Sequence, residues 1–147
     1  MAHGTDRVRL AVLALCGCLA PALVLAQERA RIDLNGEWQF RLDPSASGEA
    51  ERCHSPGVPF PDTIRVPGCW QAQGFGEPAG NLRNHYSGHA WYRRTLSIPA
   101  AWRGKIVMLR VGGVTRRAAV FVNGTRAGEH DGFSTPFSLV ISDALRP

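Results

Sequence analysis

The chain has 147 residues, of which 44% are apolar and 20% charged, and its net charge is +5. This length suits one domain, and the balance of residue types is that of a globular protein, which excludes a disordered or low-complexity chain. Because the basic residues are scattered arginines that form no stripe, and neighbours such as Arg93 and Arg94 point to opposite faces of a strand, the charge does not indicate a nucleic-acid partner.

The first segment in chain order is a candidate export signal. Arginines precede an apolar run over residues 10–25, and Ala26 places a small residue at a cleavage position. The run is short for a membrane-spanning helix and typical of a secretory signal peptide, so we expect removal of residues 1–26 and a periplasmic or extracellular protein. A rival interpretation takes the lipobox-like sequence that ends at Cys18 as the site of a lipid anchor. The apolar run continues past this cysteine, which favours ordinary cleavage.

The chain after the leader begins with a strand. Trp38, Phe40 and Leu42 alternate with polar residues, which predicts a half-buried strand with its aromatic face inward. Residues 44–61 are polar and contain glycine and proline, so they are expected to form a loop. Residues 63–66 then form a second short strand.

The segment Trp70–His89 differs from its surroundings. It is rich in glycine and contains three aromatic residues together with several amide and imidazole groups, without a clean period. About twenty irregular residues inside a domain usually form a functional loop. Aromatic rings stack on the apolar face of a pyranose, and Asn, His and Arg side chains bind hydroxyl groups, so this composition suits sugar recognition. The other interpretation is an ordinary covering loop whose aromatic rings plug one end of the core.

Short strands follow at regular intervals. Apolar patterns predict strands over residues 90–98, 105–111 and 115–122, the second of them apolar on both faces as in a central strand. Asn123-Gly124 then predicts a type I′ hairpin turn, because both central residues of that turn need positive φ. A further strand follows the turn, and the last one begins at Phe137. Regular short strands without an amphipathic helix indicate an antiparallel β-sandwich.

Two cysteines remain after the leader, Cys53 and Cys69. In an exported protein they could form a disulfide. Two cysteines are too few for a disulfide framework, however, so we favour the interpretation that Cys69 is a small buried apolar residue.

The sequence shows no catalytic constellation, no metal-ligand spacing among its histidines and no cofactor motif. His85 and His89 would meet only on a helix, and the glycine between them argues against one. Glu129 and Asp131 would share one face of a strand, but nothing nearby would hold one carboxyl protonated, as a glycosidase requires. We therefore interpret Glu129 as a strand residue and Asp131 as part of a turn, and we assign no catalytic residue, metal ligand or cofactor.

Five motifs occur in order along the chain after the leader. They are Leu34–Phe40, Val66–Trp70, Tyr86–Arg94, Val120–Gly124 and Gly128–Phe137. Together they resemble the N-terminal sugar-binding domain of family 2 glycoside hydrolases, the group of β-galactosidases, β-glucuronidases and β-mannosidases. The resemblance covers essentially the whole chain after the leader and does not identify the sugar.

This resemblance implies a jelly-roll, galactose-binding-like antiparallel β-sandwich, followed in the full-length enzyme by an immunoglobulin-like sandwich and a TIM barrel. The two catalytic glutamates of the family lie in the barrel, which needs about 250 residues, so we expect this chain alone to be inactive. In galactosidases of the family an Asn shortly after the Trp-Gln-x-x-Gly run approaches the substrate, and Asn81 is the best match. The neighbouring stretch resembles glucuronidase-like members instead. The resemblance thus implies carbohydrate contacts from Asn81, Arg83, Asn84, His85 and Tyr86.

Two functions stay open at this point. The first is the sugar-binding domain, residues 27–147, of an exported family 2 glycoside hydrolase that hydrolyses O-glycosyl bonds of a carbohydrate. The second is a free-standing carbohydrate-binding module without chemistry, and a structural role without sugar binding is a third. Relatives continue with a further strand, so we expect this domain to be truncated at the C-terminus and to self-associate through an open strand edge. A homo-oligomer is left open as well.

Overall fold

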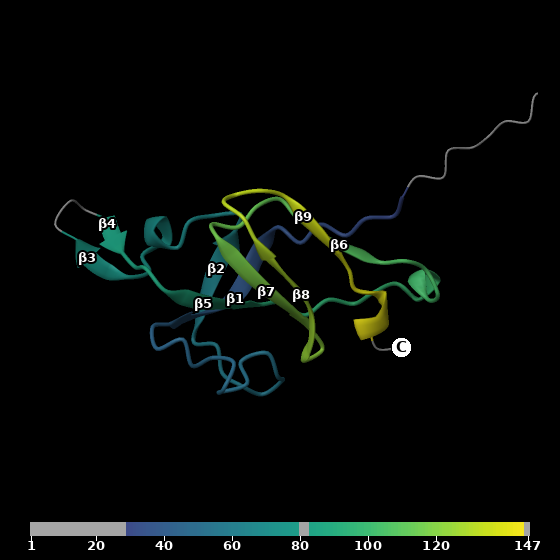
Figure 1. Ribbon diagram of the computed structural model, residues 1–147, viewed down its shortest axis with the longest axis horizontal. Helices are drawn as coiled ribbons and strands as arrows, with labels where there is room; N and C mark the ends of the chain where they lie inside the picture. The colour runs from purple at the N-terminus through teal and green to yellow at the C-terminus, as the bar shows by residue number, and fades with distance from the viewer. Residues whose placement is uncertain (1–28, 80–82, 146–147) are drawn as a thin grey trace, which may run out of the picture. The chain divides into compact units, whose positions relative to one another are not determined.

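The computed structural model describes residues 29–79 and 83–145, and the strands discussed below belong to the unit Asp33–Pro147. The predicted leader, residues 1–26, lies outside the described residues. Figure 1 shows the elements of the described ranges. They are β1 (Gly36–Asp43), β2 (Asp62–Val66), η1 (Gln71–Gln73), β3 (Glu77–Ala79), β4 (Arg83–His85), β5 (His89–Arg93), η2 (Ala100–Trp102), β6 (Met108–Val111), β7 (Arg117–Val122), β8 (Thr125–Asp131), β9 (Phe137–Val140) and η3 (Ser142–Ala144), where η marks a short 3-10 helix. No helix in these ranges is long and apolar enough to span a membrane.

All strand pairs in the described part of the chain are antiparallel. β1 lies between β2 and β5, β3 pairs with β4, β6 with β9, and β7 with β8. This confirms the predicted all-β, antiparallel β-sandwich fold class. The prediction of a central strand over residues 105–111 is wrong within the described ranges, because β6 pairs with β9 alone and Ile106 and Met108 are 79% and 59% exposed. Apolar residues on both faces of a segment do not by themselves place it inside a sheet.

The apolar face of β1 forms the centre of the core. The Phe40 side chain is fully buried, and its ring centroid lies 4.5 Å from that of Phe75 and 5.0 Å from that of Tyr92. Trp38 lies directly opposite Ile64 of β2, and the Ile64 side chain is buried. Cross-strand pairs of this kind stabilise a sheet through side-chain packing. The alternation of Trp38 and Phe40 with polar residues therefore predicted the inward face correctly.

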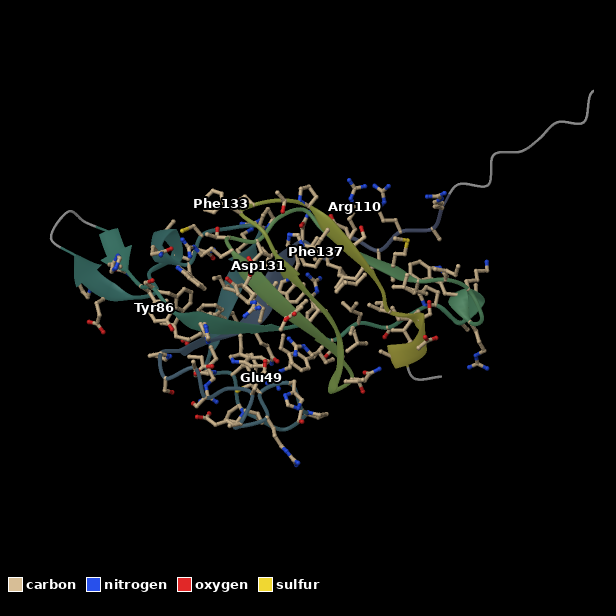
Figure 2. The ribbon with its side chains drawn as sticks, viewed as in Figure 1. Glu49, Tyr86, Arg110, Asp131, Phe133 and Phe137 are labelled. Carbon is tan, nitrogen blue, oxygen red and sulfur yellow. The ribbon has the colours of Figure 1, made fainter. Side chains whose placement is uncertain are left out.

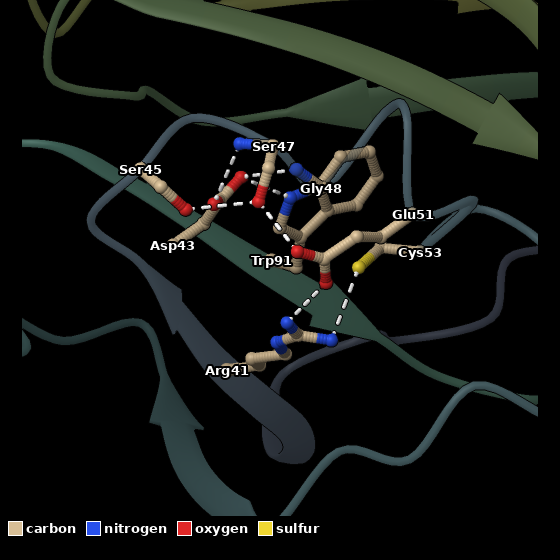
Figure 3. A network of polar contacts seen from close by, with 8 residues as sticks. All are labelled: Arg41, Asp43, Ser45, Ser47, Gly48, Glu51, Cys53 and Trp91. Carbon is tan, nitrogen blue, oxygen red and sulfur yellow. Dashed lines mark hydrogen bonds and ion pairs between the residues drawn. The ribbon is translucent and has the colours of Figure 1, made fainter.

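The opposite face of β1 is polar and anchors the loop of residues 44–61. The buried carboxylate of Asp43 accepts hydrogen bonds from the backbone N–H groups of Ser47 (3.0 Å) and Gly48 (2.8 Å) and from Trp91 Nε1 (3.0 Å), as Figure 3 shows. Burial alone would raise the pKa of Asp43, but these three hydrogen bonds outweigh it and hold the pKa below its ordinary value. A single carboxylate thus joins β1, β5 and the loop.

A second polar contact ties the same loop to β1. The Arg41 guanidinium donates hydrogen bonds to the Glu51 carboxylate and, at 3.6 Å, to Cys53 Sγ (Figure 3). Cys53 is buried, and burial raises the pKa of its thiol. Burial keeps this thiol in its unreactive, protonated form.

The two cysteines do not form a disulfide, and both are free. The prediction that Cys69 is buried is wrong, because Cys69 lies exposed between β2 and η1, where its thiol donates a hydrogen bond to Gln71 Oε1 (2.7 Å). The neighbouring Pro67 and Gly68 are exposed as well, so this turn faces solvent.

The adjacent arginines of β5 and its continuation serve the fold. The Arg93 side chain donates hydrogen bonds to Gln39 Oε1 (2.9 Å) and to a carbonyl oxygen of the 44–61 loop, and it lies over the Phe60 ring. Arg94 Nη1 donates instead to the carbonyl oxygens of Leu34 and Asn35. Both cations are held by protein groups, so neither contributes to a basic binding surface.

The β7–β8 hairpin closes at Asn123-Gly124, as predicted. Both residues have positive φ, 51° and 85°, and Val122 pairs with Thr125 on either side of them. These signs of φ are the ones that a type I′ turn requires. The local sequence alone was sufficient for this element, because the turn depends on two residues and not on distant packing.

Candidate functional site

The segment Trp70–His89 contains regular structure that its sequence did not reveal. η1 is followed by the hairpin of β3 and β4, in which Glu77 pairs with His85 and Pro78 with Asn84. The prediction of an irregular loop is therefore corrected to a short arm of two strands. Each strand has three residues, which is too short for an alternating pattern to appear in the sequence.

The predicted sugar-contacting residues gather on β4 and just after it. Asn84 is half-buried and His85 is exposed, and as neighbours on a strand they face opposite sides of the hairpin. For Arg83 the structure describes the backbone, which pairs with Ala79, and Asn81 lies outside the described residues. The hairpin thus offers an imidazole to solvent and a partly covered amide.

Tyr86 faces the protein. Its ring meets the Trp70 ring edge to face, with centroids 5.5 Å apart and an interplanar angle of 81°, and its hydroxyl donates to the His89 carbonyl oxygen at 2.6 Å. Burial raises the pKa of this hydroxyl. A tyrosine engaged in this way supports the base of the hairpin, which agrees with the covering role that the sequence left open.

Two glutamines of η1 attach the hairpin to its surroundings. Gln73 bonds to the backbone of Arg65 twice, accepting from the N–H (2.8 Å) and donating to the carbonyl oxygen (3.0 Å), as a neighbouring strand would. Gln71 Nε2 donates to the Tyr86 carbonyl oxygen at 3.1 Å. The side chain of Gln73 therefore covers part of the edge of β2. Sequence patterns did not indicate these roles, because a glutamine carries no periodic signal.

A shallow depression of about 360 Å³ lies beside this glutamine. It is lined by Gly36, Glu37, Thr63, Ile64, Arg65 and Gln73. Glu37 and Arg65 are opposite each other in the β1–β2 register, and both side chains are exposed. Charged and hydroxyl groups around a depression favour hydrogen bonding to a polar ligand.

The two carboxylates that the sequence placed near each other are engaged separately. Glu129 pairs with Arg126 (2.7 Å) and Asp131 with Arg117 (3.8 Å), and all four side chains are at least half exposed. Glu129 lies within β8, as predicted, whereas the prediction of a turn at Asp131 is wrong, because Asp131 is the last residue of that strand. Each carboxylate is paired with a different arginine, so the two do not form the adjacent pair of carboxyl groups that a glycosidase requires. In the described ranges no group of three or more His, Cys, Asp or Glu side chains is placed to bind a metal ion.

Residues 32–146 match the family described as "Glycosyl hydrolases family 2, sugar binding domain". The chain is 35% identical over 115 residues to a β-glucuronidase from Paenibacillus borealis, covering 78% of this chain and 19% of that protein. It is 32% identical over 120 residues to a β-galactosidase from Bacteroides ovatus, covering 78% of this chain and 13% of that protein.

Solved structures show the same relationship. A β-glucuronidase from Ruminococcus gnavus superposes with a TM-score of 0.68 at 32% identity, over 78% of this chain and 19% of the other. A β-glucuronidase from Lactobacillus rhamnosus gives a TM-score of 0.67 at 34% identity, over 77% and 18%. The chain therefore spans about a fifth or less of the length of the relatives it matches.

Proposed function

Because this chain belongs to the sugar-binding domain family of family 2 glycosyl hydrolases, we propose that it is the sugar-binding domain of an exported glycoside hydrolase. In this role it binds and positions carbohydrate, while bond cleavage takes place elsewhere in the protein. The family match over residues 32–146 is the observation that carries this proposal.

A glucuronide is the substrate class that we favour for the whole enzyme. The relatives with printed names are mostly β-glucuronidases, from bacteria and from mammals, although a β-galactosidase is among them. The immunoglobulin-like domain and the TIM barrel of such an enzyme are the partners that we expect for this domain, and the β3–β4 hairpin is the part that we expect to reach the sugar. The proposed sugar contacts are Asn81, Arg83, Asn84 and His85. Tyr86 supports the base of the hairpin through its contacts with Trp70 and His89.

Export is part of the proposal. The apolar leader supports cleavage after Ala26 and a periplasmic or extracellular location, with lipidation at Cys18 as the alternative. N-terminal sequencing of the secreted product tests this directly. A first residue of Gln27 supports cleavage by the general signal peptidase, and an acylated Cys18 supports the anchor.

An assay of the 147-residue chain on p-nitrophenyl β-glucuronide, β-galactoside and β-mannoside tests whether bond cleavage takes place elsewhere in the protein. We expect no turnover, because Glu129 and Asp131 are exposed and paired with separate arginines. Hydrolysis that Glu129→Gln abolishes, in a preparation free of host glycosidases, would contradict the proposal.

A free-standing carbohydrate-binding module would bind sugar in the same way but without an enzyme attached. The coding sequence beyond residue 147 distinguishes the two functions. A continuing frame with a barrel and two glutamates supports the enzyme, and an in-frame stop supports the module.

A further inference from the structure

Phe133 is an aromatic ring presented to solvent. It lies in the turn between β8 and β9 and is 73% exposed. Figure 2 shows its ring projecting from this turn, away from the ribbon. A phenylalanine with most of its surface in water contributes little to folding.

The turn that carries Phe133 is held in one conformation. On either side of Phe133, the Gly132 N–H donates to the Arg116 carbonyl oxygen and the Ser134 N–H donates to the Val114 carbonyl oxygen, both at 2.9 Å. A turn whose backbone is already ordered loses little backbone entropy when a ligand binds to its side chain.

Side chains close the turn from within. His130 Nε2 lies 2.9 Å from Thr135 Oγ1, and the His130 ring stacks on Phe137 with centroids 4.4 Å apart. A Cβ atom on Gly132 would lie 2.5 Å from Thr135 Oγ1, so there is no space for a side chain at this position. The turn is therefore a packed unit with the Phe133 ring as its exposed part.

Charged residues lie where β7 and β8 enter this turn: Asp131, the last residue of β8, pairs with Arg117 in the register. Asp131 and Arg117 face each other at 3.8 Å, with side chains 76% and 68% exposed. An exposed pair at this distance is weak, so either partner is available to a ligand. Arg116, which precedes Arg117 and bonds to Gly132 through its carbonyl oxygen, is also exposed. Two arginines and one aspartate therefore give the residues at the start of this turn a net positive charge.

We propose that Phe133 is a stacking platform for a pyranose ring, with Asp131 and Arg117 as its polar contacts, and that the ligand is a hexuronide. This inference rests on the proposed sugar-binding function and adds a second contact site, separate from the β3–β4 hairpin. The face of an aromatic ring is electronegative and attracts the C–H groups on the apolar face of a pyranose. The Asp131 carboxylate accepts hydrogen bonds from hydroxyl groups, and Arg117 binds the carboxylate of the sugar.

Titration of the full chain with methyl β-D-glucuronide, followed by NMR, tests the platform. We expect a dissociation constant of about 1–10 mM, with shifts of the Phe133 ring and of the backbone amides of residues 131–135. Phe133→Ala should weaken binding about three- to tenfold, whereas Phe133→Trp should retain it. Ile106→Ala is the matched control, since Ile106 is 79% exposed and lies outside this turn. Melting temperatures close to that of the wild type establish that the variants fold.

Methyl β-D-glucoside tests the preference for the charged sugar. The wild-type chain should bind it more weakly than the glucuronide, and Arg117→Gln should reduce this difference. Shifts confined to residues 84–86, with Phe133→Ala binding as well as the wild type, would overturn the platform and leave the proposed function intact. Absence of binding at both places would contradict the platform and the sugar-binding function together.

Discussion

Asp43 provides the sharpest test of how this fold is held together. Replacement of Asp43 by alanine leaves three donors without their acceptor, the backbone N–H groups of Ser47 and Gly48 and the indole N–H of Trp91. The Gly48 N–H is buried, while the other two donors are partly accessible to water. The loop 44–61 thereby loses its strongest attachment to the sheet.

The magnitude follows from these contacts. A buried donor left unsatisfied costs about 1–3 kcal/mol, and each of the two partly buried bonds contributes about 1 kcal/mol. We therefore expect Asp43→Ala to lower the free energy of unfolding by about 3–5 kcal/mol, a large share of the roughly 5–15 kcal/mol typical of a whole domain. Asp43→Asn keeps one oxygen acceptor and should cost about half as much.

Urea denaturation followed by tryptophan fluorescence measures this effect. With a slope of about 1.5 kcal/mol per M, a loss of about 3–5 kcal/mol lowers the midpoint by about 2–3 M. Asp62→Ala is the matched control, because Asp62 is an exposed carboxylate at the start of β2, where we expect a change within about 0.5 kcal/mol. Equal midpoints for Asp43→Ala and Asp62→Ala would refute the role of the buried carboxylate.

Three further predictions concern pH, the edge of β2 and the β7–β8 turn. The hydrogen bonds to Asp43 hold its pKa below the ordinary value, so its contribution to stability should be complete at a pH above that ordinary value and should be lost as the pH falls through the folded-state pKa. Urea midpoints measured from pH 7 to pH 3 should therefore fall more for the wild type than for Asp43→Ala. Gln73→Ala removes both the acceptor of the Arg65 N–H and the donor to the Arg65 carbonyl oxygen, so hydrogen exchange of the Arg65 amide should accelerate, and unchanged protection would show that the glutamine does not cover this edge. Gly124→Ala should cost about 1 kcal/mol, because φ is 85° there, whereas Gly112→Ala, with open space around it, should cost much less in the same urea titration; equal costs would contradict the turn assignment.

The outcomes for particular residues show where sequence patterns are reliable. The inward face of β1 and the Asn123-Gly124 turn were predicted because each depends on short-range rules, a period of two and the sign of φ. The exposure of Cys69 and the single partner of β6 were not predicted, since both depend on which distant segments cover a residue. In the candidate site, the residue types singled out the segment Trp70–His89, but the strands β3 and β4 and their pairing were not predicted.

The sequence by itself determined the all-β class and the family. Strand periodicity, turn residues and motif order depend on residues that are close together or in a fixed order along the chain, so they can be recognised without the tertiary structure. Only the tertiary structure decided which polar groups are used internally. Asp43 and Arg93 form hydrogen bonds with the 44–61 loop, and Gln73 forms them with the edge of β2. Phe133 remains exposed on the turn between β8 and β9. The physical reason is that a hydrogen bond or a buried contact depends on distances between segments far apart in the chain, and no local pattern encodes those distances.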